Sequence, residues 1–131
     1  MRLLMICLAA ALAVSAADGG GLNGEWQSAA NGETVTIRQQ GDTIQIAETG
    51  KAASEIQCRT DGQACKIKGG EVMMWYNGPM LVVMETTHGN SRVIKKRFRL
   101  SEDGKTLEEE VLRITPEGAS EKWTLARRSA S

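Results

Sequence analysis

The sequence predicts an all-β protein, an up-and-down antiparallel barrel of about eight to ten short strands. Three observations predict this fold. Apolar and polar residues alternate from Glu25 onward, and no window shows a helical period. Turn residues recur at roughly eight- to twelve-residue spacing, which is typical of hairpins. The length of 131 residues suits one domain, and closing its sheet into a barrel removes exposed strand edges.

Residues 1–17 have the layout of a secretory signal peptide. One positive charge precedes an apolar run that ends at Val14, and small residues follow it. We expect cleavage after Ala17 or Ala16, which leaves 18–131 as a single barrel domain. The apolar run is shorter than the roughly 20 residues that span a bilayer, so an uncleaved anchor is the disfavoured alternative. The sequence therefore predicts export, to a periplasm or the extracellular space, with no transmembrane segment after cleavage.

Five strand segments are predicted in the first half of the chain. Residues 24–28 follow a run of three glycines. In 33–40 and 43–49, Val and Ile alternate with polar residues, and a Gly-Asp turn separates the two segments. Residues 54–58 and 65–68 flank an Asp-Gly pair, which predicts a hairpin between them.

Five further segments are predicted in the second half, which brings the count to nine or ten. Residues 71–77 and 80–87 are joined at Asn-Gly-Pro, where proline cannot donate a ladder hydrogen bond. Residues 92–100 and 105–115 are joined by Ser-Glu-Asp-Gly, and 120–127 follows a Pro-Glu-Gly turn.

The two cysteines that remain after cleavage, Cys58 and Cys65, are predicted to form a structural disulfide. They lie on either side of the Asp-Gly turn, and an even pair in an oxidising compartment is usually bridged. Cys7 leaves with the signal peptide. A redox-active pair would favour Cys-x-x-Cys spacing, and a zinc site needs more ligands than two thiolates. We therefore expect neither a metal nor another cofactor.

Charge is concentrated in the hairpin formed by 92–100 and 105–115. If Leu100 lies opposite Leu107, then Arg99 faces Glu108 and Arg97 faces Glu110. We expect a solvated outer face on which acidic residues pair with basic ones: Lys95, Lys96, Arg97 and Arg99 with Glu108, Glu109 and Glu110. A slip of one residue would exchange the faces. The alternative, a basic patch for an anionic partner, is disfavoured because 16 basic residues balance 16 acidic ones. The same balance argues against nucleic-acid binding.

The hairpin formed by 71–77 and 80–87 is apolar at both parities. A strand with one solvated face should alternate, so we expect this hairpin to be covered on both sides. One side faces the barrel interior, and the other could form a subunit contact. A homodimer through this hairpin is therefore one hypothesis. Methionine adapts to irregular apolar ligands, so we take five residues as ligand-lining candidates, with ordinary core packing as the alternative: Met74, Tyr76, Met80, Val82 and Met84.

Catalytic signals are scarce. His88 is the only histidine and lies beside Gly89-Asn90, where a surface role at a turn is the simplest interpretation. Glu33, Glu85 and the glutamates of the 92–115 hairpin could act as acid or base, but no carboxylate pair is singled out. We therefore expect no enzyme, with a pocket built around His88 and a carboxylate as the one exception.

The segment Leu22-Asn23-Gly24-Glu25-Trp26 resembles the Gly-x-Trp opening of lipocalins and related calycins. In that family the Trp closes one end of an eight-stranded barrel and packs against a basic residue of the last strand. The resemblance implies that Trp26 and Arg127, or Arg128, form this barrel-closing pair. The turn Asp103-Gly104-Lys105-Thr106-Leu107 and the terminal Arg also resemble small exported bacterial proteins described as lipocalin-like. A Thr-Asp-Tyr-like central motif and the helix that usually follows the barrel are both missing.

The resemblance and the apolar hairpin together predict an exported protein that binds a small apolar or amphipathic molecule inside the barrel. The alternative is a structural or protein-interaction component of the cell envelope, with the interior filled by its own side chains.

Overall fold

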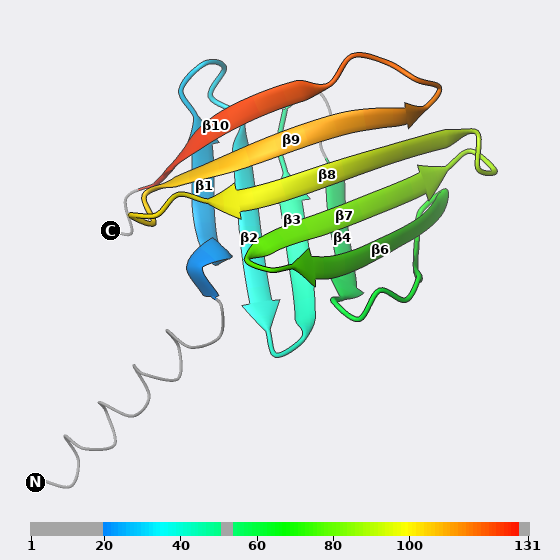
Figure 1. Ribbon diagram of the computed structural model, residues 1–131, viewed down its shortest axis with the longest axis horizontal. Coiled ribbons are helices and arrows are strands. Elements are labelled where there is room, and N and C mark those ends of the chain that lie inside the picture. The colour runs from blue at the N-terminus through cyan, green and yellow to red at the C-terminus, as the bar shows by residue number, and fades with distance from the viewer. Residues whose placement is uncertain (1–19, 51–53, 129–131) are drawn as a thin grey trace, which may run out of the picture.

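The computed structural model describes residues 20–50 and 54–128 (Figure 1). The predicted signal peptide, residues 1–17 with Cys7, lies outside the described residues. A 3-10 helix, η1, spans Gly20–Leu22, and the rest is built from strands. These are β1 (Gly24–Ser28), β2 (Thr34–Gln40), β3 (Thr43–Glu48), β4 (Ser54–Arg59), β5 (Cys65–Ile67), β6 (Gly70–Asn77), β7 (Met80–Thr87), β8 (Arg92–Leu100), β9 (Thr106–Thr115) and β10 (Glu121–Arg127).

The strands form one antiparallel sheet in the order β4-β3-β2-β1-β10-β9-β8-β7-β6-β5. Each strand pairs with its neighbours in the chain except β4 and β5, which form the two edges of the sheet. Because β1 also pairs with β10, the sheet curls into a nearly closed barrel. In Figure 1 the strands β1–β4 cross behind β6–β10 at a steep angle. The predicted up-and-down antiparallel barrel is confirmed, with ten strands rather than the eight of the lipocalin pattern. In the described part of the chain, no helix has the length and apolar character needed to cross a membrane.

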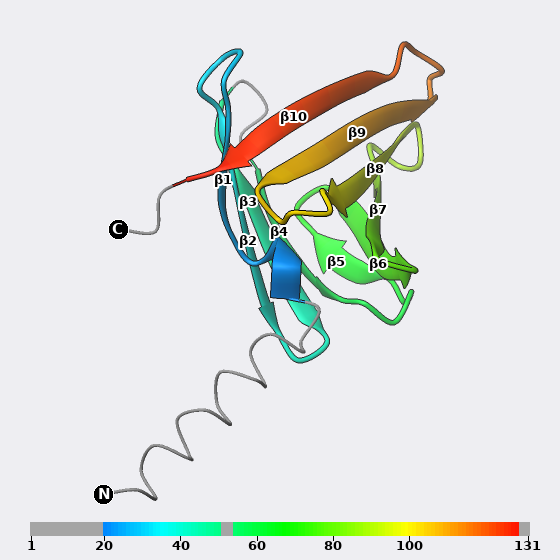
Figure 2. The same cartoon turned by 60° about the vertical axis from the view of Figure 1, so that its left-hand side comes forward.

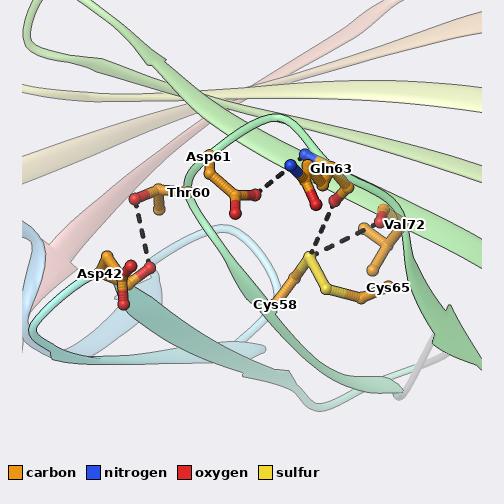
Figure 3. Close-up of a disulfide and its surroundings, with 7 residues drawn as sticks. All are labelled: Asp42, Cys58, Thr60, Asp61, Gln63, Cys65 and Val72. Atoms are coloured by element: carbon orange, nitrogen blue, oxygen red, sulfur yellow. Dashed lines mark hydrogen bonds between the residues drawn. A yellow bond between two sulfur atoms is a disulfide. The ribbon is translucent and has the colours of Figure 1, made fainter.

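The seam of the barrel lies between β4 and the β5–β6 hairpin (Figure 2). A disulfide joins Cys58 of β4 to Cys65 of β5, with 5.7 Å between their Cα atoms, as the sequence predicts. The Gly62 amide donates a hydrogen bond to the Met74 carbonyl at 2.9 Å, and Asp61 forms an isolated bridge with Trp75. Figure 3 shows how the disulfide is placed against Val72, whose carbonyl oxygen lies 3.7 Å from the Cys58 sulfur. These contacts hold together the two edges that no regular ladder joins. The hairpin predicted between residues 54–58 and 65–68 is therefore wrong, because β4 pairs with β3 and β5 pairs with β6, and only the disulfide links the two segments as expected.

One end of the barrel, which we call the closed end, is filled by apolar side chains. Inward positions on seven of the strands supply fully buried residues there, because alternation along a strand sends every second side chain inward. They include Trp26, Ile37, Ile44, Met74, Leu81, Phe98 and Leu107. Helix η1 lies at this end, and its Leu22 belongs to the same core. The closed end is therefore a packed core.

The register of β8 and β9 matches the prediction. Leu100 pairs with Leu107, Arg99 with Glu108, and Arg97 with Glu110. The Arg97 guanidinium lies 3.1 Å from the Glu110 carboxylate.

The expected outer face of this hairpin is wrong for Lys96 and Glu109. Both side chains share the parity of Phe98 and Leu107, which are core residues, and Glu109 is only 4% exposed. Side chains alternate between the two faces along β8, so Lys96 lies on the same inner face as Phe98 and Leu100. Lys95 and Arg97 point outward. Two ionisable residues of this hairpin therefore lie inside the barrel.

Candidate ligand-binding site

A cavity of about 520 Å³ occupies the other end of the barrel, which we call the open end. It lies among inward-facing residues beyond the apolar core, toward the connections β1–β2, β7–β8 and β9–β10. Its lining comprises Ser28, Glu33, Thr34, Val35, Glu48, Thr49, Ser54, Glu85, Thr87, Arg92, Ile94, Lys96, Glu109, Val111, Arg113, Glu121, Trp123 and Leu125. The barrel is thus hollow at one end and filled at the other.

Three glutamates surround one lysine in this cavity, and we call Glu48, Glu85, Glu109 and Lys96 the glutamate–lysine cluster. The Lys96 ammonium donates a hydrogen bond to the Glu48 carboxylate at 2.7 Å and lies 3.5 Å from the Glu85 carboxylate. The strands β3, β7, β8 and β9 each contribute one member. The cluster joins the two layers of the barrel, because Glu48 lies on β3 and the other three members lie on β7–β9.

The electrostatics of the cluster hold Lys96 charged. Burial by itself would lower the pKa of Lys96, but the negative charges of Glu48 and Glu85 outweigh it, so its pKa is raised. The ammonium therefore carries its charge throughout the physiological range.

The same surroundings favour the uncharged form of Glu109. Burial raises the pKa of its carboxyl to about 8, and the neighbouring negative charge of Glu48 adds to the effect. Lys96 opposes this shift without cancelling it. At neutral pH the Glu109 carboxyl is therefore mostly protonated.

The rim of the cavity carries further charges. Arg113 and Glu121 approach each other at 3.9 Å, and Arg92 and Glu33 also line the cavity. Five glutamates and three basic side chains face the space in all, so carboxyl groups are in excess.

The apolar part of the wall is smaller. It consists of Val35, Ile94, Val111, Leu125 and the half-buried Trp123. Trp123 pairs with Glu109 across the β9–β10 ladder, so the indole and the buried carboxyl are neighbours on the inner face. The cavity therefore offers an aromatic and aliphatic surface beside charged groups, which suits an amphipathic molecule.

The five ligand-lining candidates do not share a face, and none of them lines the cavity. Met74 faces inward and is fully buried in the core, and the Tyr76 hydroxyl donates a hydrogen bond to the Gln39 side chain at 2.9 Å. Met80, Val82 and Met84 point outward instead. The two-residue turn pairs Asn77 with Met80, so each even-numbered residue of β6 faces an odd-numbered residue of β7. The inner partners of Tyr76 and Met74 are therefore Leu81 and Val83.

Trp26 and Arg127 lie together at the closed end. They are partners in the β1–β10 ladder, and the Arg127 guanidinium carbon is 4.2 Å from the centroid of the Trp26 ring. The guanidinium also donates hydrogen bonds to the carbonyls of Gly21, Asn23 and Gly104, while the indole N–H donates to Leu22 at 3.0 Å. Arg128 is not in this position, because its guanidinium lies 3.5 Å from Glu25.

The glycine of the Gly-x-Trp segment has a steric role. Gly24 has φ of 139°, and a Cβ atom there would lie 2.9 Å from the Arg127 side chain. Only glycine adopts this backbone conformation easily and leaves room for the guanidinium.

His88 is exposed in the β7–β8 turn and lines a separate, more open hollow of about 390 Å³. The other residues lining it are Ser91, Arg92, Ile94, Arg113, Thr115 and Pro116, which include no carboxylate. The hollow therefore lacks the acid that the catalytic exception requires. Within residues 20–50 and 54–128, no three His, Cys, Asp or Glu side chains are arranged to hold a metal ion.

Sequence reasoning missed the glutamate–lysine cluster. The predicted register of β8 and β9 was sufficient to find Glu109, because it pairs Glu109 with the apolar Phe98 and so places it on the inner face. Extending the apolar face from Leu100 and Phe98 along β8 would have placed Lys96 inside the barrel.

Comparison with solved structures identifies the kind of barrel. A secretory abundant heat soluble protein from Ramazzottius varieornatus, crystallised from a dimer sample, superposes with a TM-score of 0.63 at 11% identity, covering 82% of this chain and 96% of the other. Secretory abundant heat soluble protein 4 from the same organism gives 0.59 at 12% identity, covering 82% and 94%. These proteins are similar in fold. The fold is that of lipocalin-like barrels. No protein-family model and no curated protein matches the sequence.

Proposed function

We propose that this protein is an exported binding protein that holds one small amphipathic molecule in the open end of its barrel. The observation that carries the proposal is the cavity of about 520 Å³, which lies inside a barrel whose other end is tightly packed. Its size falls in the range of small-molecule sites, and its lining combines an aromatic and aliphatic wall with charged groups. Export is supported by the predicted signal peptide and by the Cys58–Cys65 disulfide, which an oxidising compartment favours.

Binding can be measured with N-phenyl-1-naphthylamine, a neutral amphipathic dye whose fluorescence rises in apolar surroundings. We expect saturable binding of one dye per chain. The variant Val111→Trp fills the cavity from β9 and should weaken binding at least tenfold. Leu112→Trp adds the same bulk one residue along the strand, on the outer face, and should leave binding unchanged.

Circular dichroism checks that both variants fold. Absence of dye binding to the wild-type protein, or equal binding by Val111→Trp and the wild type, would overturn the proposal. Native mass spectrometry of protein purified from its own host then tests for a retained small molecule.

A protein-interaction role is the second candidate, and one observation favours it. The outer face of the β6–β7 hairpin collects Met73, Trp75, Met80 and Met84 around the buried Val82. Such a patch suits a contact between two copies of the chain. Sedimentation analysis of the wild type and of Met84→Lys tests it, since a homodimer through this face should dissociate in the variant. A wild-type monomer would remove this candidate.

A further inference from the structure

The cavity has a feature that narrows the class of ligand. Glu109 is only 4% exposed and lines the cavity, and no N–H or O–H group in the described part of the chain donates a hydrogen bond to its carboxyl. Its polar neighbour is another carboxylate, Glu48, which already accepts the hydrogen bond from Lys96. A buried carboxyl in this position has unused acceptor capacity toward the cavity.

We propose that the cavity binds an organic ammonium ion, such as a primary alkylamine, in exchange for the proton of Glu109. The neutral Glu109 carboxyl releases its proton to solvent, and the ammonium ion of the ligand takes its place beside the resulting carboxylate. Charge and atoms balance, since one cation enters and one proton leaves. This inference rests on the proposed function and specifies the ligand of the same cavity.

The charge distribution around Glu109 supports a cation. The charges of Glu48 on β3 and Glu33 in the β1–β2 connection act on Glu109, and Lys96 of β8 opposes them. Glu85 of β7 lines the same cavity. Arg92, Arg113 and Glu121 face the same space nearer the rim. Lys96 is one positive charge beside Glu48 and Glu85, so ionisation of Glu109 adds a further negative charge that a cationic ligand would compensate.

The aromatic neighbour also suits an ammonium ion. Trp123 lies directly across the ladder from Glu109 and lines the cavity. A cation placed against an indole face gains from the quadrupole of the ring, and the alkyl part of the ligand can contact Ile94 and Val111. An anionic head group would instead meet an excess of carboxylates. A divalent metal ion is a poorer fit, because the Lys96 ammonium already occupies the position between Glu48 and Glu85.

The inference is tested by competition against the bound dye with octylamine, octanol and octanoate, which share a chain length and differ in head group. We expect octylamine to displace the dye at concentrations at least tenfold lower than the other two require. Isothermal titration calorimetry near pH 7, in buffers of different ionisation enthalpy, should show release of nearly one proton per octylamine bound.

The pH dependence gives a second readout. An aliphatic ammonium ion stays charged up to about pH 10, so affinity for octylamine should rise roughly fiftyfold between about pH 6 and pH 8, as Glu109 loses its proton. The variant Glu109→Gln should show neither the rise nor the proton release. Glu110→Gln alters the neighbouring glutamate on the outer face, which pairs with Arg97, and should behave like the wild type.

The outcomes separate this inference from the proposed function. Equal or tighter binding of octanol or octanoate, or proton release that persists in Glu109→Gln, would overturn the ammonium exchange while leaving a ligand-binding cavity. Failure of the wild type to bind the dye at all would overturn both.

Discussion

The two ends of the barrel use the same strands for opposite purposes. At the closed end, the inward positions of β8 and β9 hold Phe98 and Leu107, which are fully buried among apolar neighbours. One inward position further along each strand, the same face holds Lys96 and Glu109. Burial of apolar area stabilises the first end, whereas burial of charge in the second is tolerated only because acid and base compensate each other. Along each strand, stabilising apolar residues at one end therefore give way to ionisable residues around a cavity at the other.

The largest expected effect comes from breaking the closed end. Trp26→Ala removes a fully buried indole, its hydrogen bond to Leu22 and its contact with Arg127. We expect the free energy of unfolding to fall by about 4 kcal/mol, measured by urea denaturation. The matched change at the open end, Trp123→Ala, should cost about half as much, because Trp123 lines the cavity and is only half-buried. Equal losses would show that the two ends do not differ in packing.

The next effect comes from removing the central cation of the open end. Lys96→Met leaves the partly buried Glu48 and Glu85 without their partner, and we expect a loss of about 3 kcal/mol at neutral pH. Lys95→Met, the adjacent lysine on the outer face, should change stability by about 0.5 kcal/mol or less. Adding Glu48→Gln to Lys96→Met should recover part of the loss. No recovery would contradict the assignment of the cost to an uncompensated charge.

The smallest effect concerns the proton on Glu109. The folded protein binds this proton with a pKa of about 8, whereas the unfolded chain releases it near 4.5. The folded state therefore binds more protons in this window, and stability falls as the pH rises. Between about pH 6 and pH 8, the wild type should lose about 2 kcal/mol that Glu109→Gln does not lose. Urea denaturation at several pH values measures the difference, and Glu110→Gln should keep the wild-type slope. A wild-type stability that is flat across this window would contradict a buried proton.

Much of the fold follows from local pattern. Alternation and turn residues predict all ten strands to within a residue or two, and the Asp-Gly turn predicts the Cys58–Cys65 disulfide. The pairing of Leu100 with Leu107 could also be predicted from the sequence, since a short turn between charged strands leaves few registers. These features depend on residues that are close in the chain.

The five ligand-lining candidates lie on two different faces for a local reason as well. The prediction selected even-numbered residues on both strands of the central hairpin, although a two-residue turn at Gly78-Pro79 pairs even with odd. Counting through the turn would have assigned Met80, Val82 and Met84 to the outer face.

The sequence by itself determined the strands, their order around an antiparallel barrel, the disulfide and the closeness of Trp26 to the chain's last strand, because each rests on short-range alternation, turn chemistry or a recognisable segment. Only the tertiary structure decided that one end is hollow and that Glu109 and Lys96 share it. Lys96 meets Glu48 from 48 residues away in the chain. The ionisation of a buried group depends on such distant neighbours across the barrel, and no local pattern records them.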